Sequence, residues 1–208
     1  MKLEKNSWIF PVISVLYFLS ALWTVTARFI NGLLCSHADA TAVIIFSYVD
    51  NAANAALLGA GLAVAFGFAA GGCSGACKTA FKLGMSGAIV AFVYFLFYLL
   101  FSSSSTIIYV DLILILAFGL LEFSMFCIFA FKTCSDLRVW AFISAAAALI
   151  SALTLSAQML STIMIMVSHN ILEWMEILAF AGKAELFCDI IHCILCGMFF
   201  LLARENSK

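Results

Sequence analysis

Charged residues are scarce in this chain. Asp, Glu, Lys and Arg make up only 10% of its 208 residues, whereas 66% are hydrophobic; in soluble proteins about a quarter of the residues are charged. Such a chain cannot cover itself with polar surface, so lipid must be the solvent for most of it. The composition therefore predicts an integral membrane protein whose first partner is the lipid bilayer.

Several other features are missing, and each absence excludes a class of protein. No cluster of Lys and Arg offers a phosphate-binding surface, so we expect no nucleic-acid partner. The glycine-rich stretch 70–78 does not match a phosphate-binding loop, and no His-Glu-x-x-His or Gly-x-Ser-x-Gly motif occurs. We therefore expect neither an enzyme nor an organic cofactor. Ten-residue alternating strands, typical of an outer-membrane barrel, are absent too.

Long apolar helices are what the chain does contain, with 21 phenylalanines and a single proline. Scanning for about 20 apolar residues per span predicts an all-α bundle of six transmembrane helices in a single domain, residues 1–208. The first of them ends in a Val25-x-Ala27 sequence similar to a signal-peptide cleavage site, but its length favours a retained helix. The predicted spans are 8–27, 48–71, 84–103, 106–131, 139–160 and 185–203.

The eight cysteines lie mostly within apolar segments or at their ends. Cysteine in such surroundings behaves as a small hydrophobic residue. We therefore expect reduced thiols that contribute to packing, rather than a disulfide framework.

The basic residues predict the orientation of the bundle. If six helices alternate across the membrane, eight of the ten Lys and Arg residues fall on the side that carries both termini. Positively charged loops stay in the cytoplasm. We therefore expect both termini in the cytoplasm and the protein in the cytoplasmic, or inner, membrane.

Two segments fit this scheme less well. The stretch 161–182 would make seven spans if it crossed the membrane, and its two glutamates favour an amphipathic helix at the outer surface or a helix partly folded into the bundle. The stretch 37–49 either extends the second span outward or forms a separate outer piece.

The last span carries a polar stripe in an otherwise apolar segment. Glu185, Asp189, His192 and Cys196 follow the spacing i, i+4, i+7, i+11, which places them on one helical face. Ionisable groups at this depth are costly in hydrocarbon. The stripe is therefore predicted to face other helices or water.

Other spans offer polar groups that can meet this stripe. Asp111 and Glu122 lie eleven residues apart on one face of the fourth span, and Gln158 belongs to a Ser/Thr face of the fifth. Ser and Thr faces often serve close helix packing alone. The acids need protonation, a basic partner or a wet cavity, so we predict a proton or substrate pathway through Asp111, Glu122, Gln158, Asp189 and His192.

A second polar set lies near the outer boundary. His169, Glu173 and Glu176 share one face, and with Glu185 we expect them to form an outer entrance that attracts cations. Acid and imidazole groups one turn apart also suit a metal ion, so Glu185, Asp189 and His192 are metal-ligand candidates. Any polar helical face gives the same spacing, so the spacing alone does not decide whether a metal ion binds.

These observations favour a small transporter-like bundle with a proton- or cation-binding polar centre and an ion or small molecule as substrate. Its size makes a homodimer or a larger membrane assembly plausible. Two alternatives stay open: a membrane sensor or anchoring domain that acts through a cytoplasmic partner, and a metal-binding membrane enzyme.

Overall fold

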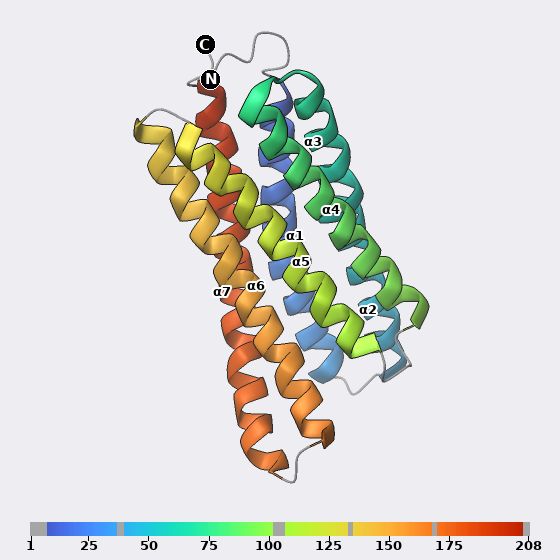
Figure 1. Cartoon of the computed structure of the whole chain (residues 1–208). Helices are drawn as coiled ribbons and strands as arrows, with labels where there is room; N and C mark the ends of the chain where they lie inside the picture. Colours follow the sequence, from blue (N-terminus) through green and yellow to red (C-terminus); the bar gives the residue numbers. More distant parts are fainter. Residues whose placement is uncertain (1–7, 37–39, 102–106, 133–134, 168–169, 206–208) are drawn as a thin grey trace.

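The computed structural model describes residues 8–36, 40–101, 107–132, 135–167 and 170–205, and all regular structure in them is helical. Figure 1 shows long helices packed side by side in one bundle. The elements in chain order are α1 (Ile9–Ser36), α2 (Ala40–Asn54), η1 (Ala55–Gly61), α3 (Leu62–Gly71), α4 (Gly75–Phe101), α5 (Ile107–Lys132), α6 (Ser135–Val167) and α7 (Ile171–Glu205).

Among the residues that the structure describes, six helices are long and apolar enough to cross a membrane, the number predicted from the sequence. The second is continuous through α2, the π-helical η1 and α3. Most of the helices extend beyond the predicted apolar segments at one or both ends. The longest, α7, has 35 residues and is about 52 Å long, whereas a bilayer core is about 30 Å thick. The membrane-capable helices are 9–36, 40–71, 75–100, 109–132, 137–167 and 171–204.

The two uncertain segments join neighbouring spans. Residues 161–167 continue α6 and residues 171–182 begin α7. Of the two alternatives for 161–182, the separate surface helix is therefore wrong, and the described residues belong to helices of the bundle. In Figure 1 the far ends of α6 and α7 form a hairpin that projects beyond the other helices. Residues 40–49 are part of α2 and extend the second span outward.

The start of α1 and the end of α7 lie at the same end of the bundle (Figure 1), which we call the terminal end. The side chain of Ser14 in α1 donates a hydrogen bond of 2.8 Å to the carbonyl oxygen of Gly197 in α7, so the two helices are antiparallel neighbours. Lys132 ends α5 and Arg204 lies in the last turn of α7, both also at this end. That this end faces the cytoplasm stays a prediction.

The six spans form a closed ring. Going round it, α1 packs on α7, α7 on α6, α6 on α5, α5 on α4, and α4 on the second span, which returns to α1. Helices in lipid associate through close packing, and small residues permit it. A Cβ on Gly59 would lie 2.8 Å from the backbone of Phe92, and one on Gly119 would lie 2.2 Å from Cβ of Ala152. Glycine at these two positions sets how closely the second span approaches α4 and α5 approaches α6.

An aromatic layer fills the ring at the terminal end. Its rings are fully buried, with neighbouring centroids between 5.1 and 6.3 Å apart in the contacts of Phe81, Phe199 and Phe200. Edge-to-face and offset pairs at these distances are the favoured aromatic arrangements. The bundle is therefore closed at this end by a dry layer, whose members are Phe10, Phe66, Phe81, Phe126, Phe129, Phe199 and Phe200.

Candidate functional site

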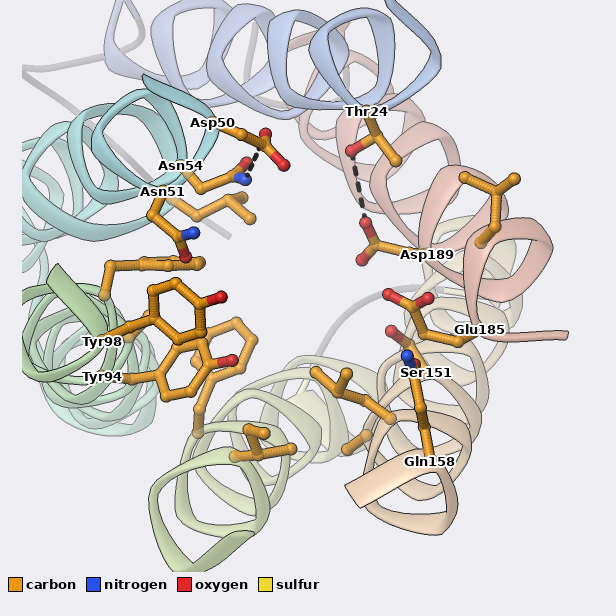
Figure 2. Close-up of a pocket in the computed structure, with 18 of the residues that line it drawn as sticks. Thr24, Asp50, Asn51, Asn54, Tyr94, Tyr98, Ser151, Gln158, Glu185 and Asp189 are labelled. Atoms are coloured by element: carbon orange, nitrogen blue, oxygen red, sulfur yellow. Dashed lines mark hydrogen bonds between the residues drawn. The ribbon is translucent and has the colours of Figure 1, made fainter. Parts of the chain in front are cut away.

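A cavity of about 410 Å³ lies inside the ring, in the half of the bundle away from the terminal end, and every span contributes to its wall. Figure 2 shows the helices surrounding it. The face of α7 that carries Glu185, Asp189 and His192 lines this space, as the predicted stripe requires. These polar groups therefore face a cavity and not the acyl chains.

The cavity has an aromatic wall opposite an acidic one. Tyr94 and Tyr98 of α4 lie side by side with their hydroxyl groups toward the open space, and Glu185 and Asp189 lie across from them (Figure 2). The sequence analysis did not predict that Tyr94 and Tyr98 line the cavity. The signal that could have indicated it is the presence of two tyrosines, four residues apart, in a phenylalanine-rich span. Such a mixture of rings and convergent polar groups is typical of a small-ligand site.

Asp50 of α2 is held by hydrogen bonds from α1 and from its own helix. Its Oδ1 accepts hydrogen bonds from Nε1 of Trp23 in α1 at 2.8 Å and from Nδ2 of Asn54 in the next turn at 3.1 Å. Asn54 directly precedes the π-helical turn Ala55–Gly61, and π-helical turns are frequent at functional sites. The bonds hold the carboxylate at the wall where the second span leaves regular α-geometry.

The mouth of the cavity carries an ion pair. Nη2 of Arg28 lies 3.4 Å from Oε2 of Glu185, with the arginine side chain 48% exposed and the glutamate 21%. An exposed pair of this kind contributes at most about 1 kcal/mol to stability. Its larger effect is on charge, because Arg28 is the basic member of a described lining that also holds Asp50, Glu185 and Asp189. With these carboxylates ionised, the lining has a formal charge of +1 − 3 = −2.

His192 forms the floor of the cavity. It is 3% exposed, and its Nδ1 lies 4.0 Å from Oδ1 of Asp189, one turn nearer the mouth. Oδ2 of Asp189 accepts a long hydrogen bond of 3.4 Å from Oγ1 of Thr24 in α1. The ring of Tyr17 lies edge-on to the imidazole, with centroids 6.2 Å apart.

Glu122 of α5 lies beneath this floor and is also 3% exposed. Its Oε1 accepts a hydrogen bond from the hydroxyl group of the fully buried Tyr17. Its Oε2 lies 3.1 Å from Nε2 of His192, but the two groups are not aligned as a hydrogen bond. Among the described residues, Oε2 of Glu122 and both ring nitrogens of His192 therefore lack a hydrogen-bond partner.

Two cysteines complete this buried centre. The ligand atoms of Glu122, His192 and Cys196 all lie within 4.8 Å of one another, and so do those of Asp189, His192 and Cys193. Beyond them Tyr17 stacks on Phe200, with centroids 6.1 Å apart and ring planes 9° apart. The polar centre thus rests directly on the aromatic layer.

The structure brings together part of the predicted pathway. Glu122, Asp189 and His192 meet in the centre, and Gln158 lines the cavity wall. Asp111 does not line the cavity, although it is buried and its Oδ1 has no hydrogen-bond partner among the described residues. Eleven residues of helix separate it from Glu122 by about 16 Å.

The predicted outer entrance is only partly assembled. Glu185 lines the mouth, but Glu173 and Glu176 are exposed on the projecting hairpin and do not line the cavity. They begin α7 nine or more residues before Glu185, more than two turns beyond the mouth. His169 lies outside the described residues. Of the predicted metal candidates, Asp189 and His192 belong to a ligand group and Glu185 does not.

The serines illustrate the packing role that small hydroxyl residues have in membranes. Ser14 bonds to the carbonyl oxygen of Gly197, and Ser144 of α6 bonds to that of Leu195 at 3.2 Å. Both bonds end on α7 beside the buried centre. These serines bind the backbone of α7, so the acidic and imidazole side chains of α7 are not used for this contact and face the cavity.

Comparisons with protein-family models, with curated proteins and with solved structures return no match for this chain.

Proposed function

We propose that this helical membrane bundle is a small transporter that carries a cation, a proton or a metal ion, through its polar centre. The observation that supports this most is the cavity whose floor is His192, with the buried carboxylate of Glu122 directly behind it. Buried ionisable groups are expensive within a membrane and mark ion or substrate pathways. A packing role alone gives no reason to place them at the end of a cavity.

The distribution of charge supports a cation over an anion. With its carboxylates ionised the described lining has a formal charge of −2, and Glu122 adds a further carboxylate behind the floor. A negative potential inside a low-dielectric wall raises the local concentration of cations. An anion would meet repulsion at Asp50, Asp189 and Glu122.

The closed aromatic layer supports a carrier over an open channel. The cavity occupies one half of the bundle, and buried phenylalanines fill the other half. Carriers hold their site near the middle of the membrane and expose it to one side at a time. In this proposal the structure represents the state whose cavity opens away from the terminal end. The protein lies in the cytoplasmic membrane, with both termini in the cytoplasm.

Transport by the full chain in proteoliposomes tests the proposal. A trapped pH dye follows protons, and a trapped metal indicator follows Zn²⁺, each under an imposed gradient. We expect uptake of at least one probe above protein-free vesicles. Asp189→Asn and His192→Ala should reduce the initial rate about tenfold or more, because each removes a group that the cation must contact.

Glu173→Gln and Glu176→Gln are matched controls, since both remove a carboxylate from the same helix outside the cavity. We expect them to transport at the wild-type rate. Uptake of both probes at the rate of protein-free vesicles would refute the carrier. Wild-type rates in Asp189→Asn and His192→Ala would remove the polar centre from the mechanism.

A further inference from the structure

Glu122, His192 and Cys196 bring three kinds of ligand atom to one buried point. Glu122 comes from α5 and the other two from α7, where they are one turn apart. All three side chains are buried, and their ligand atoms lie within 4.8 Å of one another. In the ring α5 and α7 do not pack directly on each other but share α6 as a neighbour, so tertiary structure alone creates the group.

The geometry between Glu122 and His192 does not suit a direct hydrogen bond. Their oxygen and nitrogen are 3.1 Å apart, yet both atoms are without an aligned partner among the described residues. A buried polar atom without a partner costs about 1–3 kcal/mol. Two ligands at about 2.0–2.1 Å from a tetrahedral metal ion are themselves roughly 3.3 Å apart. A separation of 3.1 Å suits an ion pair with a protonated imidazole, and it also suits two ligands of one shared metal ion.

We infer that Glu122, His192 and Cys196 bind a divalent transition-metal ion of the zinc type, which reaches them through the cavity. Carboxylate, imidazole and thiolate together suit zinc, whereas magnesium and calcium prefer all-oxygen sites. Because the inference names the cation of the proposed transporter, it rests on the proposed function.

Neighbouring groups are placed to orient the ligands. Tyr17 donates to the second oxygen of Glu122, which leaves Oε2 for the metal. Asp189 lies 4.0 Å from Nδ1 of His192, on the side of the ring away from Glu122. Outer carboxylates that pair with the second nitrogen of a metal-bound histidine are common in zinc sites. Small side-chain movements are needed to close both contacts.

Three protein ligands leave a fourth position for water or a counter-ligand. His192 lines the cavity, whereas Glu122 and Cys196 lie behind it, so an ion from the cavity must pass the His192 ring to reach all three ligands. An incomplete shell of this kind suits a transported ion, which must leave again, better than a permanent structural site.

The competing group of Asp189, His192 and Cys193 uses the other ring nitrogen. Asp189 is partly exposed to the cavity and already accepts a hydrogen bond from Thr24. Glu122, in contrast, has an unpartnered oxygen and no exposure to relieve it. The first group is therefore the assigned site.

Equilibrium binding of Zn²⁺ to the purified full chain in detergent, after removal of metal with a chelator, tests the site. We expect one ion per chain and a thiolate-to-metal charge-transfer band when Co²⁺ replaces Zn²⁺. Glu122→Gln, His192→Asn and Cys196→Ser should each weaken binding about 100-fold or more, beyond the 10–100-fold typical for loss of an outer-shell partner. Cys196→Ser should also abolish the Co²⁺ band.

Cys188→Ser is the matched thiol control on α7, since Cys188 belongs to neither ligand group. It and Cys193→Ser should bind Zn²⁺ as the wild type does. If the wild type shows no saturable Zn²⁺ binding, or if its Co²⁺ complex lacks a thiolate band, the inference is overturned. Both results come from the wild type, so they hold even if a variant fails to fold. Loss of binding in Cys193→Ser with retention in Cys196→Ser would overturn the assignment.

The two proposals fail separately in these assays. Stoichiometric Zn²⁺ binding without flux in vesicles would uphold the metal site and refute the transporter. Proton flux without Zn²⁺ binding would refute the metal site and uphold the transporter.

Discussion

The hydrogen bond between Tyr17 and Glu122 offers the sharpest test of how the polar centre is held together. It joins α1 to α5 across the inside of the ring, between two fully or nearly fully buried side chains. Tyr17→Phe removes the donor and keeps the ring that stacks on Phe200. Glu122→Met keeps a similar size and removes both acceptor oxygens of the carboxylate.

The expected coupling energy follows from the environment of the pair. Hydrogen bonds between membrane helices contribute about 0.6 kcal/mol on average and about 1.7 kcal/mol at most in double-mutant cycles. Bonds to charged groups contribute about 1.5–3 kcal/mol in proteins. A buried phenol–carboxylate bond belongs at the upper end of the membrane range, so we expect a coupling of about 1.5 kcal/mol. Tyr17→Phe alone should lower the free energy of unfolding by about 1–2 kcal/mol.

The assay is a double-mutant cycle of wild type, both single variants and the double variant, unfolded by SDS in mixed micelles. Such a cycle isolates the pairwise energy from the separate effects of each change. Tyr94→Phe is the matched control, because its hydroxyl group faces the cavity (Figure 2). We expect that control to lie within about 0.5 kcal/mol of the wild type.

Additive single effects would refute this account of the centre. Independent sites add within about 0.3–0.5 kcal/mol, so a coupling below that range means that Tyr17 and Glu122 do not support each other. A loss in Tyr94→Phe as large as that in Tyr17→Phe would equally show that burial of the hydroxyl group is not the cause.

Two further predictions concern packing and orientation. Gly119→Ala should lower the free energy of unfolding by about 1–3 kcal/mol in the same SDS assay, because the new Cβ meets Ala152 at 2.2 Å. Gly32→Ala, which meets no atom within 4 Å, should not destabilise, and equal losses in both would refute the packing argument. A membrane-impermeant maleimide should label the exposed Cys35 in intact cells, since it lies at the end of α1 away from the terminal end. Lys132→Cys in a Cys35→Ser background should be labelled only after permeabilisation, and the reverse pattern would place the termini outside.

The spans were predictable because a bilayer imposes a length and a composition on every helix that crosses it. Their ends were less so. The predicted apolar spans end at 160 and begin again at 185, but helical structure does not require an apolar sequence, and α7 already begins before the exposed Glu173 and Glu176. One of the two alternatives for 161–182, a separate surface helix, was wrong for this reason.

The polar face of α7 was predictable for a similar reason. Helical periodicity puts Glu185, Asp189 and His192 on one side, and the cost of charge in lipid turns that side inward. Periodicity also aligns Asp111 with Glu122, but it cannot tell which of the two is level with His192. Only Glu122 lies level with His192, because the axial offset of α5 against its neighbours in the ring sets the position of Glu122 along the bundle.

The number of membrane-capable helices, their approximate positions and the inward direction of the last polar stripe can be derived from the sequence alone, since each follows from the energy of moving one helix into lipid. Which side chains meet depends on the packed bundle: Tyr17 meets Glu122, Glu122 meets His192 and Cys196, and two tyrosines of α4 lie opposite the acids of α7. These pairings depend on the rotation and axial offset of each helix against its neighbours, and on glycines that let the backbones approach. Such relations between helices leave no periodic signal within any one of them.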